Sequence, residues 1–208
     1  MSYKYVSVEK KGRIATVRFD RGIDVNPLSI DAMKELTEVA KSFEGDTETS
    51  AIILTGNGRN FTVGFDLKDP AATARISAPV MERREMLSVG PKMSKAWEDL
   101  QPMTIVAVDG YCIGGGVALS VACDMRVASK GAIFWVPEIR NGMNMSWQSV
   151  PRMVNLMGPA RTKQLCIVAD QISAETAEKW GLIEEVAEDH AEGINAFLEK
   201  RDPEFKGR

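Results

Sequence analysis

The sequence has few of the residues on which several classes of protein depend. Its 208 residues include three cysteines and a single histidine. The cysteines are odd in number, widely spaced and without a C-x-x-C pair, which argues against a disulfide framework or a zinc site and favours a reducing compartment. The histidine, His190, lies in a polar stretch typical of a solvated surface. We therefore expect no Ser-His-Asp triad and no metal site.

Long apolar runs and an excess of one charge are also lacking. No run approaches the roughly 18 residues that a membrane span needs, and the first residues form no apolar signal segment. Lys and Arg number 26 against 29 Asp and Glu, a net charge of −3, so no sequence-wide basic field exists for a phosphate backbone. These absences predict a cytoplasmic protein that binds neither membrane nor nucleic acid.

The chain does contain short apolar segments that alternate with longer helical patterns, which is typical of an α/β fold. The two most apolar strands end in glycine turns and are expected to be buried on both faces of a sheet. Gly90-Pro91 is expected to divide one long helical pattern into two helices. The expected strands are 5–8, 14–19, 51–55 and 104–108, and the expected helices lie within 30–43, 79–100, 117–123, 160–168, 173–180 and 191–200.

Two glycine-rich segments, 55–68 and 109–116, each follow one of the apolar strands. Neither has the pattern of a P-loop or of G-x-G-x-x-G, so phosphate binding by those routes is disfavoured. Glycines after a strand are usually turns, and this is the simplest interpretation of either segment alone. If the two strands are neighbours, however, backbone N–H groups from both turns converge on one point, where they can bind an oxyanion. The helix that opens at Gly116 would add its positive end.

The residues of these turns match those of a known family. The matching stretches are 51–61, 63–68, 108–116, 122–128, 137–139, 158–160 and 192–201. On these stretches the sequence resembles the enoyl-CoA hydratase/isomerase, or crotonase, superfamily. The resemblance implies a spiral of ββα turns that assembles as a homotrimer or hexamer. The family's helices between residues 187 and 192 are missing, which predicts a core domain at 1–188 and a shortened C-terminal helical tail at 189–208.

The resemblance also implies the binding site for an acyl-CoA thioester. The thioester oxygen is expected between the backbone N–H groups of Phe65 and Gly115. Coenzyme A belongs to the substrate, so no separate cofactor is expected. The residues expected along coenzyme A are Ile23, Asp24, Val25, Pro27, Phe65, Asp66, Leu67, Lys68, Gly115 and Lys200.

Family hydratases use two glutamates, and the sequence retains only the second, as Glu138; the first is Ala118. Water addition ordinarily needs one group for the water and another for the α-carbon proton, whereas a single carboxylate suffices to move a proton between two carbons. The sequence therefore favours a 3-enoyl-CoA to 2-enoyl-CoA isomerase. A 2-enoyl-CoA hydratase with one glutamate and a CoA-binding or assembly module without activity stay open as alternatives.

Large side chains near Glu138 in the sequence suggest what surrounds it. Phe134, Trp135 and Trp147 are expected to desolvate the carboxyl group and to raise its pKa. Met143, Met145, Trp147 and Met153 are candidates for an acyl pocket, but their spacing favours ordinary core packing.

Overall fold

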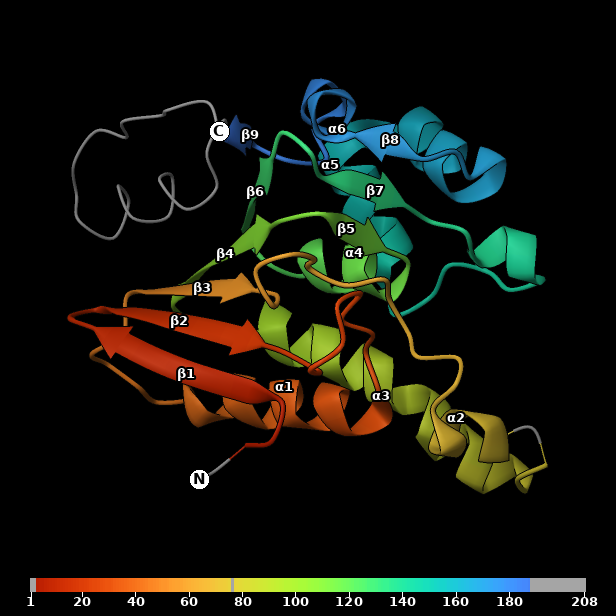
Figure 1. Ribbon diagram of the computed structural model, residues 1–208, viewed down its shortest axis with the longest axis horizontal. Coiled ribbons are helices and arrows are strands. Elements are labelled where there is room, and N and C mark those ends of the chain that lie inside the picture. Colours follow the sequence, from red (N-terminus) through yellow and green to blue (C-terminus); the bar gives the residue numbers. More distant parts are fainter. Residues whose placement is uncertain (1–2, 76, 188–208) are drawn as a thin grey trace.

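A six-stranded sheet forms one layer of the protein in the computed structural model, which describes residues 3–75 and 77–187 (Figure 1). The strand order is β1-β2-β3-β4-β6-β9, and every pair is parallel except the β1-β2 hairpin. The predicted α/β class is confirmed, and β3 and β4 are neighbours as the two-turn hypothesis requires. The strands are β1 Val6–Lys11, β2 Ile14–Phe19, β3 Ala51–Thr55, β4 Met103–Val108, β6 Met125–Ser129 and β9 Glu185–Ala187.

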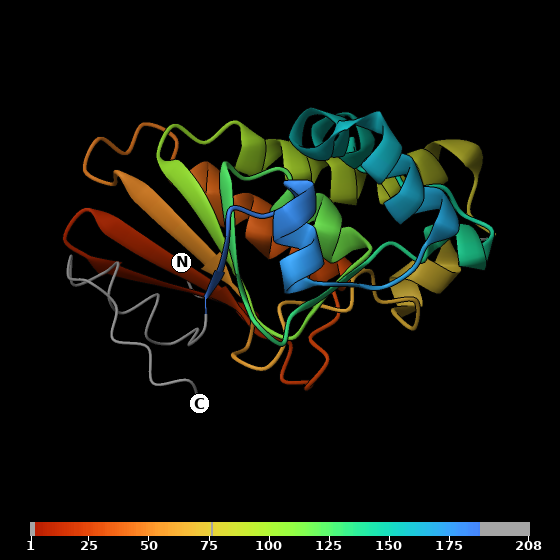
Figure 2. The same ribbon diagram turned by 90° about the horizontal axis from the view of Figure 1, so that it is seen from above.

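A second sheet has three short strands, β5 Tyr111–Ile113, β7 Ile133–Trp135 and β8 Ile172–Ser173, in the order β5-β7-β8. Strands β4 and β6 of the large sheet are each followed by a strand of the small sheet and then by a helix. This repeat is the predicted spiral of ββα turns. Figure 2 shows the helices gathered to one side of the large sheet.

The helix boundaries agree with capping signals in the sequence. The Ser29 side chain accepts a hydrogen bond from Ala32 N–H at the start of α1, and Ser173 does the same for Thr176 N–H at the start of α6. Gly181 ends α6 in the left-handed conformation. The helical segments are α1 Ile30–Ser42, α2 Pro70–Ala74, α3 Val80–Glu98, α4 Gly115–Ser120, η1 Glu138–Asn141, α5 Ser149–Lys163, η2 Gln164–Val168 and α6 Ala174–Trp180.

The expectation of two helices within 79–100 is wrong, because α3 runs continuously with Pro91 inside it. A proline in a helix interior costs about 3 kcal/mol. Met93 and Trp97 are fully buried on this helix, and burial of each large side chain contributes about 1.5–3 kcal/mol. Packing of the two side chains therefore offsets the proline.

The part of the chain after residue 187 lies outside the described residues. This applies to the expected helix at 191–200, to His190 and to Lys200. The division into a core at 1–188 and a tail at 189–208 stays a prediction.

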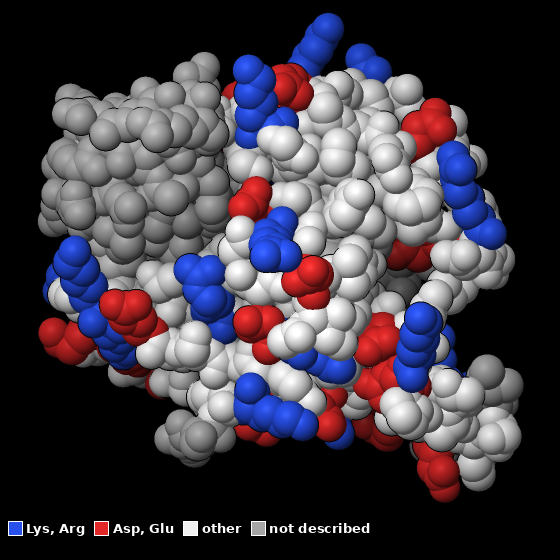
Figure 3. All heavy atoms as spheres, in the orientation of Figure 1, with Lys and Arg blue, Asp and Glu red and all other residues white. Residues whose placement is uncertain are grey.

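Basic and acidic side chains are interspersed on the face seen in Figure 3, rather than gathered by sign. Among residues 3–75 and 77–187, no helix has the length and hydrophobicity needed to cross a bilayer, and no cluster of His, Cys, Asp or Glu has the geometry of a metal site. Cys112, Cys123 and Cys166 are all free thiols.

Candidate active site

The two glycine-rich turns lie side by side. Thr62 and Cys112 form a parallel bridge, in which Thr62 N–H donates to Tyr111 C=O at 2.8 Å and Ile113 N–H donates to Thr62 C=O at 3.0 Å. Continued by three residues, this register places Phe65 beside Gly115. Two turns 50 positions apart in the sequence thus meet because β3 and β4 are adjacent in the sheet.

The backbone N–H groups of Phe65 and Gly115 both lack an acceptor within the described part of the chain. A Cβ atom placed on Gly115 would lie 3.5 Å from the Phe65 nitrogen. Gly64, with φ 86°, brings the turn close, since a Cβ there would lie 3.1 Å from the Gly115 nitrogen. Two free donors at one small space are the arrangement that can hold a carbonyl oxygen as negative charge develops on it.

Both turns open onto a cavity of about 550 Å³. Its wall is mainly apolar, with one carboxylate, one guanidinium and a few amides, which is the usual character of a small-molecule site. No motif in the sequence indicates that Arg75 or the α3 residues contribute to this wall. The lining side chains and glycines include Met33, Phe65, Leu67, Arg75, Met86, Leu87, Gly90, Gly114, Gly115, Ala118, Glu138, Asn141, Met143, Asn144, Met145 and Trp147.

Glu138 faces this cavity from the start of η1, directly after β7. A Cβ atom on Gly114 would lie 2.6 Å from Glu138 Oε1, so the carboxyl group rests against the glycine turn. Gly114 has φ 51°, a left-handed conformation that favours glycine. Glu138 Oε2 is buried and has no hydrogen-bond partner among the described residues. The carboxylate is therefore available to a bound molecule.

Burial raises the pKa of Glu138 above the usual range of a glutamate, because desolvation penalises the charged form. A raised pKa makes the carboxylate a stronger base and increases the fraction of Glu138 that is protonated near neutral pH, so both forms are present to take and return a proton. The neighbouring thiol of Cys166 stays protonated, since burial and the charge of Glu138 raise its pKa to about 11. Glu138 is therefore positioned to exchange a proton with a ligand in the cavity.

Ala118 lines the same cavity from the first turn of α4, where its N–H donates to Gly114 C=O at 3.0 Å. The side chain is 1% exposed. The position that carries a glutamate in family hydratases therefore lines the same cavity as Glu138, but it brings only a methyl group. Among the described lining residues, Glu138 is the one carboxylate.

The Trp147 side chain packs against the glycine turn at Gly115 and against α3 at Gly90. A Cβ on Gly115 would lie 2.6 Å from Trp147 Cζ3, and one on Gly90 would lie 2.1 Å from Trp147 Cε2. The indole thus lies between two glycines. It packs edge-on against the Phe65 ring, with 6.4 Å between the two ring centroids. Gly90 is needed for this close approach, a role that its place beside Pro91 in the sequence did not indicate.

The expected surroundings of Glu138 are correct only in part. Trp147 lines the cavity, but Phe134 is fully buried in the core and Trp135 donates its Nε1–H to Ala169 C=O at 2.7 Å. Neither of these two aromatic residues is among those that line the cavity. The interpretation of the methionines also needs correction, because Met143 and Met145 line the cavity. Met153 is core, as expected.

The segments expected along coenzyme A lie beside one another at the cavity's edge. Val63 N–H donates to Val25 C=O at 3.1 Å, and Asp66 N–H donates to Leu28 C=O at 2.9 Å. Ile23, Asp24, Val25 and Lys68 are exposed, and Pro27 and Asp66 are half-buried. Leu67 is 57% exposed and also lines the cavity. The structure thus places residues 23–28 and 63–68 side by side, and the exposed residues among them form one edge next to the two free N–H groups.

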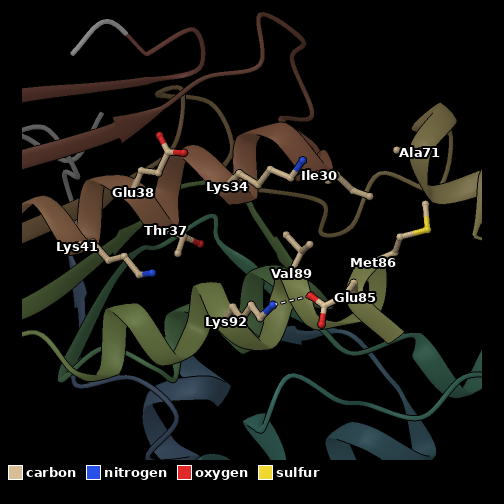
Figure 4. A pocket seen from close by; sticks show the side chains of 10 residues that line it. All are labelled: Ile30, Lys34, Thr37, Glu38, Lys41, Ala71, Glu85, Met86, Val89 and Lys92. Carbon is tan, nitrogen blue, oxygen red and sulfur yellow. Dashed lines mark hydrogen bonds and ion pairs between the residues drawn. The ribbon is translucent and has the colours of Figure 1, made fainter. Parts of the chain in front are cut away.

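A second cavity of about 510 Å³ lies between α1 and α3 (Figure 4). Lysines and glutamates line it over an apolar floor, and Lys92 and Glu85 form an ion pair at 2.9 Å. None of the residues predicted for the thioester site is among those that line it. Met86 of α3 lines both cavities, so they adjoin at this residue.

Residues 9–190 match the enoyl-CoA hydratase/isomerase family. The chain belongs to this family. It is 34% identical over 189 residues to the short-chain-enoyl-CoA hydratase of Clostridium acetobutylicum, covering 90% of this chain and 70% of that one. It is 32% identical over 189 residues to the crotonyl-CoA hydratase of Syntrophomonas wolfei, covering 90% of this chain and 71% of that one.

Solved structures of the family have the same fold. An enoyl-CoA hydratase/isomerase from Marinobacter aquaeolei superposes with a TM-score of 0.85 at 24% identity, over 94% of this chain and 76% of that one. An enoyl-CoA hydratase from Bacillus halodurans superposes with a TM-score of 0.85 at 23% identity, over 95% and 80%. The crotonase-type fold expected from the sequence is therefore confirmed.

Proposed function

We propose that this member of the family hydrates 2-enoyl-CoA thioesters, with Glu138 as the one carboxylate and the N–H groups of Phe65 and Gly115 as the oxyanion hole. The observation that carries the proposal is a buried carboxylate oxygen without a partner, in the same cavity as two free backbone donors. The hydratase names of the two relatives support water addition over the isomerisation that the sequence favoured. The exposed edge formed by residues 23–28 and 63–68 would carry coenzyme A.

In the proposed reaction, Glu138 performs both proton transfers. Its carboxylate takes a proton from water as the water oxygen bonds to C3 and the π electrons move to the thioester oxygen. The N–H groups of Phe65 and Gly115 stabilise this enolate, each contributing about 2.7–4 kcal/mol in comparable sites. The enolate then takes the proton from Glu138 at C2, and the carboxylate is restored. The sum is one water added across the double bond.

Isomerisation of a 3-enoyl-CoA is a second candidate, which the methyl group of Ala118 specifically favours. In that reaction Glu138 removes a proton from C2, the oxyanion hole holds the dienolate, and the same proton returns at C4. No water is activated, so no second carboxylate is required. Assembly as a homotrimer or hexamer is a further proposal, based on the family resemblance.

Incubation in deuterated water with 2-hexenoyl-CoA and, separately, with 3-hexenoyl-CoA tests the proposal by mass spectrometry of the products. We expect the 2-enoyl thioester to give 3-hydroxyhexanoyl-CoA with deuterium at C2. Conversion of the 3-enoyl to the 2-enoyl thioester, without hydration of either, would contradict hydration and favour isomerisation. If both thioesters bind but neither reacts, the chain is a binding module and both proposals fail.

A further inference from the structure

One cationic side chain lines the cavity that holds Glu138. Arg75 follows the short helix α2 and is half-buried. Among the described lining residues it is the one basic side chain, and Glu138 is the one acidic side chain. The cavity therefore has opposite charges on two of its residues and is otherwise neutral.

The guanidinium of Arg75 has no carboxylate partner among residues 3–75 and 77–187. Other shielded arginines in the protein do have one: Arg126 pairs with Glu184 at 2.5 Å, and Arg152 pairs with Glu98 at 2.7 Å. Arginine presents five N–H donors in one plane and binds a carboxylate with two of them. An arginine without an anion in a cavity wall is thus equipped to bind one from a ligand.

An aromatic ring holds this guanidinium in place. The Arg75 Cζ atom lies 5.0 Å from the centroid of the Phe65 ring, a cation–π contact. Stacking on a ring fixes the guanidinium plane and leaves its edge donors free, so little side-chain entropy is lost when an anion binds. The binding group is therefore preorganised before a ligand enters.

Phe65 also connects Arg75 to the proposed reaction centre. Its N–H is one of the two free donors, and its ring carries the guanidinium. The expected position of the thioester oxygen is therefore separated from Arg75 by at most the length of one phenylalanine plus the 5.0 Å between the ring centroid and Arg75 Cζ. Met33, Met86 and Leu87 line the cavity in addition. This apolar wall suits an acyl chain of several carbons and is unlike the exposed edge formed by residues 23–28 and 63–68.

We propose that Arg75 binds a carboxylate at the far end of the acyl chain, so that the preferred substrates are enoyl-CoA monothioesters of dicarboxylic acids. The inference rests on the proposed function for the position of the thioester. Glu138 favours one orientation of such a substrate, because its charge repels the substrate carboxylate from the reacting end and Arg75 attracts it to the other end. The alternative source of an anion is a phosphate of coenzyme A, which the same arginine would bind in every thioester.

Calorimetric binding of two saturated thioesters of equal length tests this inference without requiring turnover. Adipyl-CoA carries a terminal carboxylate where hexanoyl-CoA carries a methyl group. We expect the wild-type protein to bind adipyl-CoA about tenfold more tightly or better. Arg75→Gln should abolish this preference and leave the Kd for hexanoyl-CoA within about threefold. Arg84→Gln, which removes an exposed arginine of α3 outside the cavity wall, should change neither Kd.

Equal binding of the two thioesters by the wild-type protein would overturn the inference. So would an Arg75→Gln variant that loses the same affinity for adipyl-CoA, hexanoyl-CoA and free coenzyme A, since that result places the guanidinium on a phosphate. Binding of neither thioester would reject the site itself. A carboxylate preference without hydration of either 2-hexenoyl-CoA or its analogue with a terminal carboxylate supports the inference and rejects the reaction, so the two failures are distinguishable.

Discussion

Replacing Glu138 with glutamine is expected to lower kcat for hydration of 2-hexenoyl-CoA by about 10²–10⁴-fold. The amide keeps the size of the carboxyl group and its contact with Gly114, but it can neither take a proton from water nor return one to C2. KM should change little, because the proposed contacts to the thioester are made mainly by backbone groups. Steady-state kinetics on purified variant and wild type measure both quantities.

Glu85→Gln is the matched control, because Glu85 lines the second cavity and not the first. Its kcat should equal that of the wild type.

The Glu138→Gln protein should also be no less stable at pH 8. Burial raises the pKa of Glu138 in the folded state. Ionisation of Glu138 therefore lowers the free energy of unfolding at pH values above this raised pKa. It has no such effect below the pKa of an unfolded glutamate, about 4.3, where the side chain is protonated in both states. Retained turnover in a folded Glu138→Gln variant would remove Glu138 from the mechanism.

Adding one methyl group at Gly115 is expected to lower kcat/KM by about 10²–10³-fold. The new Cβ would lie 3.5 Å from the Phe65 nitrogen, in the space where the thioester oxygen must fit, and 2.6 Å from Trp147 Cζ3. The methyl group thus keeps an oxygen from reaching both donors at once. Kinetics of Gly115→Ala with 2-hexenoyl-CoA give the loss directly.

Two further variants separate this effect from general disturbance. Gly131→Ala adds the same methyl group where no atom lies within 4 Å, and it should react like the wild type. The double variant Gly115→Ala with Trp147→Ala gives the methyl group room on the indole side. Recovery of activity in the double variant would show that displacement of Trp147, and not obstruction of the oxyanion hole, caused the loss.

Local signals in the sequence were sufficient for much of the fold. Ser29, Ser173 and Gly181 mark helix ends by hydrogen-bonding and dihedral preferences that act within a few residues. The convergence of the two glycine turns needed one further assumption, that the strands before them are neighbours. The family resemblance supplied it, and the β3-β4 register confirms it.

Features that depend on distant packing could not be predicted in this way. The Gly90-Pro91 pair signals a helix break, but burial of Met93 and Trp97 outweighs that local preference. Arg75 follows a five-residue helix whose sequence has no amphipathic pattern, so nothing local indicates that its side chain faces a cavity. Only the contact with the Phe65 ring, ten residues earlier, places it there.

The central claim is that one carboxylate performs both proton transfers, and the pH profile of kcat/KM tests it most directly. A two-carboxylate mechanism needs one group ionised and one protonated, which gives a bell-shaped profile. A single base needs only ionised Glu138, so the rate should fall on the acidic side alone. The thiol of Cys166, with a pKa raised to about 11, adds no second limb in the neutral range.

We therefore predict that hydration of 2-hexenoyl-CoA by the wild-type protein decreases as the pH falls through the raised pKa of Glu138 and stays level from there to about pH 9. Ala118→Glu supplies a second carboxylate in the cavity wall and should add a basic limb to the profile. A bell-shaped profile in the wild-type protein, or an acidic limb that persists in Glu138→Gln, would contradict the single-carboxylate account.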